Sequence, residues 1–139
     1  MAGFETWTTS ETQTEDGLLS IRNRAALPPP MKRAKLPHLI LIGWGYEPDG
    51  EGGMPTAAEL KQMAAFEAAV EKALDADGAG FPVASITGEG AREWRYYAAD
   101  PDAFMDALND ALDGHPEYPI EFVAYDDPEW DALAELIED

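Results

Sequence analysis

The hydrophobic and polar positions of this chain follow two different periods, which together predict a mixed α+β fold. Between residues 36 and 46 the apolar residues are nearly continuous, a pattern typical of a central strand whose two faces are both covered. From residue 56 to about residue 76 apolar residues recur every three or four positions, which predicts an amphipathic helix. Strand patterns follow at 81–87 and 91–98.

Two Asp-Pro pairs mark further helix starts, because Asp accepts hydrogen bonds from free helical amides and proline suits the first helical position. Asp100-Pro101 predicts a helix that ends before Gly114, residues 120–125 form a strand pattern, and Asp127-Pro128 predicts a last helix. From residue 36 the elements therefore predict a ferredoxin-like β-α-β-β-α-β core. The handedness of the connections places strands 36–46 and 91–98 side by side at the sheet centre, with both helices on one face.

The first 35 residues predict an addition to this core. Residues 4–12 and 18–26 form two strand patterns around a turn, so we expect a hairpin that extends the sheet. Pro28-Pro29-Pro30 predicts a rigid extended connector, continued as a loop by the basic residues 31–35. The chain is thus predicted to be a single domain, 1–139, made of hairpin and Pro-rich connector (1–35), ferredoxin-like core (36–125) and C-terminal helix (126–139).

The charge of the chain is strongly acidic and uneven. Its 28 acidic and nine basic residues give a net charge of −19, which repels phosphate backbones, so we expect no nucleic-acid binding. Five of the nine bases lie between residues 22 and 35, and no Lys or Arg follows Arg95. This pattern favours either an acidic surface that attracts a basic protein or a solvated surface that keeps the protein in solution.

Composition also limits the location of the protein. The chain has no cysteine, which excludes disulfides and thiolate chemistry. It has no apolar run long enough to span a bilayer, and residues 1–10 do not have the pattern of a secretory signal. We therefore expect a cytoplasmic protein that does not bind a membrane.

Residues suited to catalysis or metal binding are sparse. His38 and His115 each flank a proline in a predicted loop, with no positioned partner for a general base. Asp126, Asp127 and Glu129 could hold a metal ion, but Asp127 is already explained as a helix cap. No serine has the context of a nucleophile elbow. We expect no catalytic residue, no metal site and no cofactor.

The sheet face without helices is the candidate binding face. An uncovered apolar patch is unusual on a monomer, so the last helix, the N-terminal segment or a second copy of the chain in a homodimer would cover it. Alternatively the face binds a small molecule, with loop 47–55 as a lid. Base stacking is disfavoured because mainly Arg95 is available to contact phosphates. The residues of this candidate face are Trp44, Tyr46, Arg92, Glu93, Arg95 and Tyr97.

A series of short motifs runs along nearly the whole chain: Trp7, Ile21-Arg22-Asn23, Leu36-Pro37-His38-Leu39, Gly53-Met54-Pro55, Glu67, Ala91-Arg92-Glu93-Trp94-Arg95-Tyr96-Tyr97 and Asp127-Pro128-Glu129-Trp130. In this order they resemble the family catalogued as domain of unknown function 695. The resemblance implies no assigned activity and no catalytic residues. In some related proteins such a domain stands beside one similar to the ribonuclease E inhibitor (regulator of ribonuclease activity B), a small acidic protein, which implies a more distant resemblance to that inhibitor.

Two functional hypotheses follow from the sequence. The first is a non-catalytic acidic interaction or regulatory module that binds a basic protein surface, and it predicts salt-sensitive association. The second is a small-molecule-binding protein or enzyme that uses the open sheet face. It predicts an enclosed pocket with an ionisable residue of shifted pKa.

Overall fold

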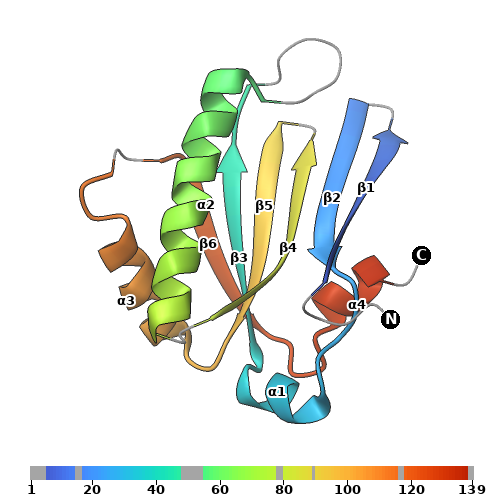
Figure 1. Cartoon of the computed structure of the whole chain (residues 1–139), viewed down its shortest axis with the longest axis vertical. Helices are drawn as coiled ribbons and strands as arrows, with labels where there is room; N and C mark the ends of the chain where they lie inside the picture. The colour runs from blue at the N-terminus through green and yellow to red at the C-terminus, as the bar shows by residue number, and fades with distance from the viewer. Residues whose placement is uncertain are drawn as a thin grey trace.

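A computed structural model describes residues 6–14, 17–47, 55–77, 80–88, 90–115 and 118–137. Its strands form one six-stranded antiparallel sheet in the order β1-β2-β4-β5-β3-β6 (Figure 1). The strands are β1 (Trp7–Thr14), β2 (Gly17–Arg24), β3 (His38–Gly45), β4 (Phe81–Gly88), β5 (Ala91–Ala98) and β6 (Ile120–Asp126). The helices are α1 (Pro30–Lys35), α2 (Ala57–Asp77), α3 (Pro101–Ala111) and α4 (Asp131–Ile137).

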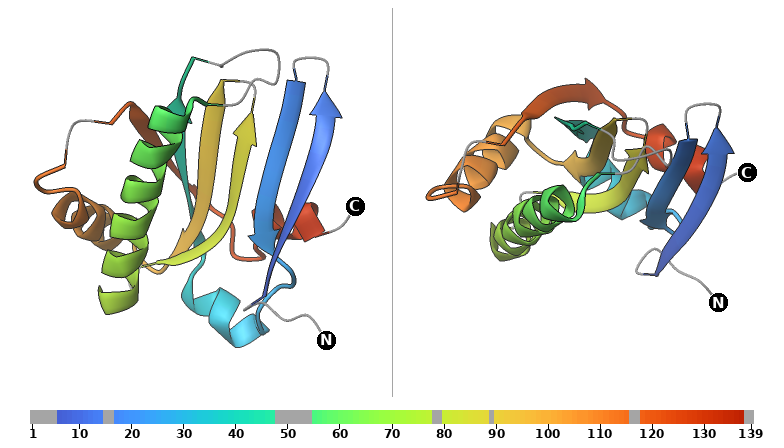
Figure 2. Two further views of the ribbon diagram at one scale, coloured as in Figure 1. Left: turned by 45° about the horizontal axis from the view of Figure 1, so that its top comes forward. Right: turned by 90° about the horizontal axis from the view of Figure 1, so that it is seen from above.

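The two strands predicted for the sheet centre are neighbours, as expected. β3 pairs with β5, with Ile40 opposite Tyr96 and Ile42 opposite Trp94. These four side chains pack in one core with residues of α2 and α3. Both helices lie on one face of the sheet, which we call the helical face (Figure 2). The predicted placement of both helices on one face is confirmed. The buried side chains of this layer are Ile40, Ile42, Trp44, Met63, Phe66, Val70, Leu74, Trp94, Tyr96, Ala98, Phe104 and Leu108.

The opposite face of the sheet, here the back face, has its own smaller core. Leu39 and Tyr97 lie there next to each other on paired strands. Trp130 and Leu133 from the C-terminal segment pack onto them and are fully buried. The last helix is therefore a cover of this face, one of the three alternatives that the sequence left open.

The N-terminal hairpin extends the sheet as predicted. β1 pairs with β2 along its whole length, and β2 pairs with β4 so that Arg22 lies opposite Ser85. The hairpin continues the sheet beyond α2, and its helical face is left without a covering helix in the described part of the chain (Figure 1).

Two expectations about loops and helix starts were wrong. The segment 31–35 is helical, because α1 begins at Pro30, where the missing amide of proline costs no hydrogen bond. The last helix begins at Asp131, not at Pro128, because Trp130 has a positive φ of 60° that interrupts helical geometry. Asp127 still caps this helix, since its carboxylate accepts from the amides of Asp131 (3.0 Å) and Ala132 (3.1 Å).

The predicted cap at Asp100 is present, and Thr56 caps the start of α2. Thr56 Oγ1 accepts from the amide of Glu59 at 3.1 Å, and Asp100 accepts from the amide of Asp102 at 3.0 Å. Both hydroxyl and carboxylate satisfy amides that have no partner within the helix.

Among the helices in the described ranges, none has the length and apolar character needed to cross a membrane.

Candidate functional site

The residues predicted to form one binding face are divided between the two faces of the sheet. In the β3–β5 register Trp44 lies opposite Arg92, whereas Gly43 lies opposite Glu93. Because neighbouring residues of a strand point to opposite faces, these two pairs cannot share a surface. The expectation of a single face was wrong for that reason. Trp44, Tyr46 and Arg92 belong to the helical side, and Glu93, Arg95 and Tyr97 belong to the back face.

Trp44 is part of the helical core and is not a ligand platform. Its side chain is fully buried, with ring centroids 5.8 Å from Phe66 and 6.1 Å from Trp94. Its indole Nε1 donates to the Glu59 carboxylate at 2.8 Å. Tyr46 is partly buried against the same core, and burial raises the pKa of its hydroxyl. The fully buried Trp44 ring is therefore not available for stacking on a bound molecule.

The three back-face residues attach α4 to the sheet. The Tyr97 ring lies beneath Trp130, and its hydroxyl donates to Asp127 at 2.6 Å. Arg95 donates to the Ala132 carbonyl at 2.6 Å and to Glu93 and Glu135 at 2.7 Å each. Burial alone would lower the pKa of Arg95, because it disfavours the charged form. The Glu93 and Glu135 carboxylates have the larger combined effect, and the pKa is raised. The side chains explain how the last helix is held, without a free reactive group.

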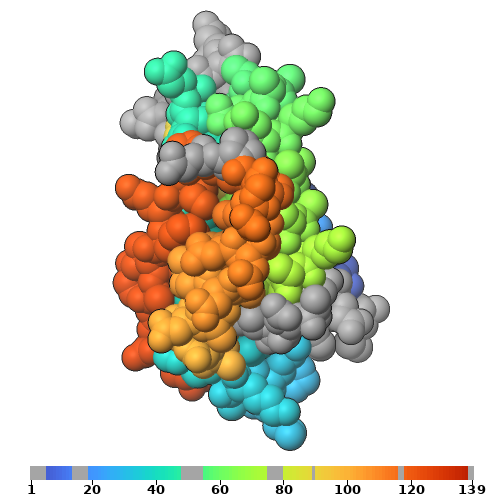
Figure 3. All heavy atoms as spheres, turned by 90° about the vertical axis from the view of Figure 1, so that its left-hand side faces the viewer, coloured from blue at the N-terminus to red at the C-terminus, as the bar shows by residue number. Residues whose placement is uncertain are grey.

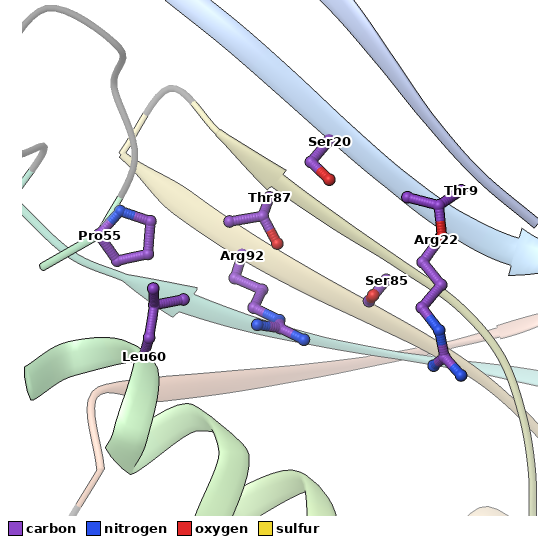
Figure 4. Close-up of a pocket in the computed structure, with 8 residues that line it drawn as sticks. All are labelled: Thr9, Ser20, Arg22, Pro55, Leu60, Ser85, Thr87 and Arg92. Carbon is purple, nitrogen blue, oxygen red and sulfur yellow. The ribbon is translucent and has the colours of Figure 1, made fainter. Parts of the chain in front are cut away.

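A groove lies between α2 and the N-terminal hairpin on the helical face (Figure 4). We call it the arginine groove. It has a volume of about 280 Å³, and its two charged side chains, Arg22 and Arg92, come from β2 and β5. In Figure 4 both guanidinium groups point to the same side of the sheet, with Ser85 between them. The lining residues are Thr9, Ser20, Arg22, Pro55, Leu60, Ser85, Thr87 and Arg92.

Strand register explains why these polar side chains meet. Arg22 lies opposite Ser85, and Ser20 lies opposite Thr87 in the β2–β4 pair. Thr87 in turn lies opposite Arg92 in the β4–β5 pair. Directly paired residues share a face, so the hydroxyls and guanidiniums gather on the uncovered part of the helical face. The groove is therefore lined by two cations and four hydroxyls in a chain of net charge −19.

Arg92 is held in place by Glu67 and Trp94. Its Nη2 lies 3.5 Å from the Glu67 carboxylate, and its guanidinium lies 5.0 Å from the ring centre of Trp94. Trp94 Nε1 donates to the same Glu67 oxygen at 3.1 Å. The Nε atom of Arg92 is buried and has no hydrogen-bond partner among the described residues. One edge of this guanidinium therefore retains an unused donor.

Arg22 also belongs to a row of cation–aromatic contacts that continues from the groove through Arg24 to Lys32. The guanidinium of Arg22 lies 4.1 Å from the ring centre of Trp7, and that of Arg24 lies 4.6 Å from it. Arg24 also lies 3.9 Å from the ring centre of Phe81, and Lys32 lies 4.3 Å from that ring. These contacts gather positive charge along one side of an acidic protein.

The opposite edge of the sheet has a different character. β6 is the last strand in the sheet order, and Figure 3 shows this side of the molecule, with β6 beside α3. Phe122, Val123 and Tyr125 on β6 are 37%, 46% and 52% exposed. They make up three of the five exposed large apolar side chains of the described residues. The charged residues of β6, Glu121 and Asp126, are acidic and exposed.

Sequence reasoning found Arg92 but not the groove to which it belongs. Arg22 and Arg92 lie far apart in the sequence, and only the pairing of β2, β4 and β5 brings them together. One signal was present: Arg22, Pro55 and Arg92 all belong to the motifs that carry the family resemblance, and they line one groove.

Other expectations about the site concern metals and the loop. No group of three or more potential metal ligands occurs within the described ranges. Asp126 pairs with His38 Nδ1 at 3.0 Å, and Asp127 serves as a helix cap. Residues 48–54 lie outside the described part of the chain, so the structure does not bear on their predicted role as a lid.

Comparison with known proteins identifies a family. A family model described as "Family of unknown function (DUF695)" matches residues 5–136. No curated protein and no solved structure matches the chain. The resemblance to domain of unknown function 695 is therefore confirmed, and the more distant resemblance to the ribonuclease E inhibitor stays a prediction.

Proposed function

This chain belongs to DUF695, a family of unknown function, and we propose that it is a non-catalytic interaction module that docks an extended basic segment of a partner protein along β6. The observation that carries the proposal is the clustering of exposed apolar side chains on this edge strand, where Phe122, Val123 and Tyr125 are all partly open to solvent. A regulatory role would follow from that binding.

An edge strand is a template for a further strand. Its outer backbone amides and carbonyls are available for pairing, and an added strand gains main-chain hydrogen bonds while pockets for alternate side chains give specificity. Val123 lies opposite Leu41 and Tyr125 lies opposite Leu39, so both point to the back face. A docked segment with apolar residues at alternate positions would extend that apolar surface.

Charge supports a basic partner. Every charged residue after Arg95 is acidic, and this region contains α3, β6 and α4. On α3, Asp102, Asp106 and Asp110 are exposed. Like-charged surfaces repel and opposite charges steer encounter, so the edge favours a partner rich in Lys and Arg.

The two sheet edges differ in a way that favours β6 over β1. From residue 8 to residue 13 the side chains of β1 are exposed, and all six are polar. Polar and charged side chains discourage pairing at an edge, whereas exposed apolar ones promote it. β1 therefore provides a matched negative control on the same sheet.

A second copy of the chain is the other occupant that this edge could take. Two copies would bring two acidic edges together, each from a chain of net charge −19. Salt screens that repulsion and would strengthen a homodimer, but it weakens the attraction between an acidic edge and a basic partner. The sign of the salt dependence therefore separates the two occupants.

The test is affinity capture from a lysate of the native host with three forms of the protein: wild type, Val123→Lys and Ser10→Lys. The first substitution places a cation on the β6 edge, and the second places the same charge on exposed Ser10 of β1. We expect a basic partner bound by wild type and Ser10→Lys at about 50 mM salt and lost at about 500 mM. The Val123→Lys form should lose it at both salt concentrations.

Equal capture by the Val123→Lys and wild-type proteins would reject the β6 edge as the docking site. If light scattering shows a dimer that high salt stabilises, the occupant of the β6 edge is a second copy of the chain and not a basic partner. Recovery of ribonuclease E at low salt would support the distant resemblance to the ribonuclease E inhibitor.

The ferredoxin-like description of the core, 36–125, and the cytoplasmic location are further parts of this proposal. Support for the fold comes from the strand order, since β5 lies between β3 and β4, and β3 lies between β5 and β6. Each helical connection therefore skips one antiparallel strand, which is the pattern of a split β-α-β unit.

A further inference from the structure

We propose that the arginine groove binds the phosphate or carboxylate group of a small organic molecule between Arg22 and Arg92. The inference is independent of the proposed function, because the groove lies on β2, β4 and β5 and the docking edge is β6, at the far end of the strand order. It assigns the N-terminal hairpin the role of one wall of a ligand site.

The donors in the groove suit an oxyanion. Two guanidinium groups and the hydroxyls of Ser20, Ser85 and Thr87 line the same space. Guanidinium donors match the spacing of carboxylate and phosphate oxygens and form charge-assisted hydrogen bonds with them. The hydroxyls can each donate one further bond to the anion.

The state of Arg92 favours an external acceptor. Glu67 occupies its Nη2 at 3.5 Å, but its buried Nε has no partner among the described residues. A buried donor without an acceptor is unfavourable, and an oxyanion beside it would supply one. Glu67 also fixes Trp94 through its indole at 3.1 Å, so the carboxylate acts as a positioning group for Arg92.

The far wall provides space for the organic part of the molecule. Pro55 and Leu60 line the groove on the side of α2, and Leu60 is 43% exposed. A groove of about 280 Å³ is close to the lower end of the range for small-molecule sites. The combination of one anionic end and one apolar wall fits a small organic acid or phosphate ester.

A purely structural role would explain less of this arrangement. Arg22 covers Trp7 at 4.1 Å, which alone could account for its position. Glu67 and Glu71 also line a much smaller adjoining cavity together with Arg22 and reduce the net positive charge nearby. Neither contact explains why the side chains between the two arginines are all hydroxyls.

The test uses the side-chain Nε–H signals of the five arginines in ¹H–¹⁵N spectra of the whole chain. Inorganic phosphate and succinate are titrated separately, with ionic strength held constant by sodium chloride. We expect saturable shifts at Arg22 and Arg92 with a millimolar dissociation constant in at least one titration. The titration that saturates identifies the anionic group as phosphate or carboxylate.

Variants then locate the site. Arg22→Gln should raise the dissociation constant by about tenfold or more, since one of two charge-assisted contacts is removed. Arg22 is exposed, so this variant is expected to fold, which keeps the test valid even if Arg92→Gln does not. Lys35→Gln removes the same charge from exposed Lys35 in α1, outside the groove, and should change the constant by less than about twofold.

Three results would overturn the inference. The first is that neither phosphate nor succinate gives a saturable shift. The second is that sodium chloride alone produces the same shifts. The third is that Arg22→Gln and Lys35→Gln weaken binding equally, which would indicate a general effect of charge and not a site.

Discussion

The indole of Trp130 lies flat on the phenol ring of Tyr97, with ring centroids 4.1 Å apart and planes within 3° of parallel. Both side chains are fully buried, and Trp130 Nε1 donates to the Leu36 carbonyl at 2.9 Å. The φ of Trp130 is 60°, a left-handed conformation that costs a non-glycine residue about 1–2 kcal/mol. Burial of the indole offsets that cost and fixes the C-terminal segment on the back face.

Replacement of Trp130 by alanine should therefore lower the free energy of unfolding by about 3–5 kcal/mol, as expected for a buried large aromatic. Urea denaturation followed by circular dichroism measures this change. Val123→Ala is the control, because that side chain is 46% exposed, and it should change stability by less than about 0.5 kcal/mol. A loss below about 1 kcal/mol for Trp130→Ala would mean that α4 does not depend on this contact.

Tyr97 should make the protein sensitive to alkali. Burial and the neighbouring Asp127 carboxylate raise the pKa of its hydroxyl far above the ordinary value near 10. The unfolded chain loses this proton from about pH 10, whereas the folded chain keeps it, so stability is complete below that pH and falls as the pH rises. Tyr96 contributes in the same direction, because burial and Glu67 raise its pKa.

Above about pH 10 the release of this one proton should lower the free energy of unfolding of the wild type by up to about 1.4 kcal/mol per pH unit. Tyr97→Phe should remove this contribution to the slope. Urea denaturation at intervals between about pH 8 and pH 11.5 measures that slope. Tyr125→Phe provides a matched control on a tyrosine that is 52% exposed. Identical alkaline slopes for Tyr97→Phe and the wild type would rule out this contribution.

Asp126 and Asp127 are adjacent but should differ greatly in their effect on stability. Asp127 accepts from the Tyr97 hydroxyl and from the amides of Asp131 and Ala132. Its replacement by alanine removes a helix cap and leaves the Tyr97 hydroxyl without its carboxylate acceptor, so we expect a loss of about 2–4 kcal/mol. Asp126 is 87% exposed and pairs with His38, so Asp126→Ala should cost less than about 1 kcal/mol. Equal losses in thermal or urea denaturation would contradict the capping role.

Two glycines provide a similar contrast in packing. A Cβ atom on Gly80 would lie 2.7 Å from Cδ2 of Phe104, whereas one on Gly43 would meet nothing within 4 Å. Gly80→Ala should therefore cost about 1–3 kcal/mol through overpacking. Gly43→Ala should be neutral or stabilise the protein by up to about 1 kcal/mol, because the unfolded chain loses freedom. Calorimetry of both variants checks the order, and a more stable Gly80→Ala protein would contradict it.

The local pattern of the sequence predicted much of the fold but not the arrangement of the binding residues. Periodicity and caps gave correct positions for α2, α3 and the central strands. They failed for residues 31–35, where the sequence predicts a loop that continues the proline connector, whereas a helix begins at Pro30. They also failed for the candidate face, because 36–46 is apolar on both sides and alternation alone cannot say which side the helices cover.

The sequence by itself determined the mixed α+β class, the family and the acidic character, because each depends on local pattern or on composition. It also predicted the adjacency of the two central strands, through the handedness of the connections. Only the tertiary structure decided that Arg22 and Arg92 line one groove and that Trp44 is core. It also decided that β6 is the apolar edge. These features depend on which strands pair and in which register, and a shift by one residue would turn every side chain of a strand to the other face.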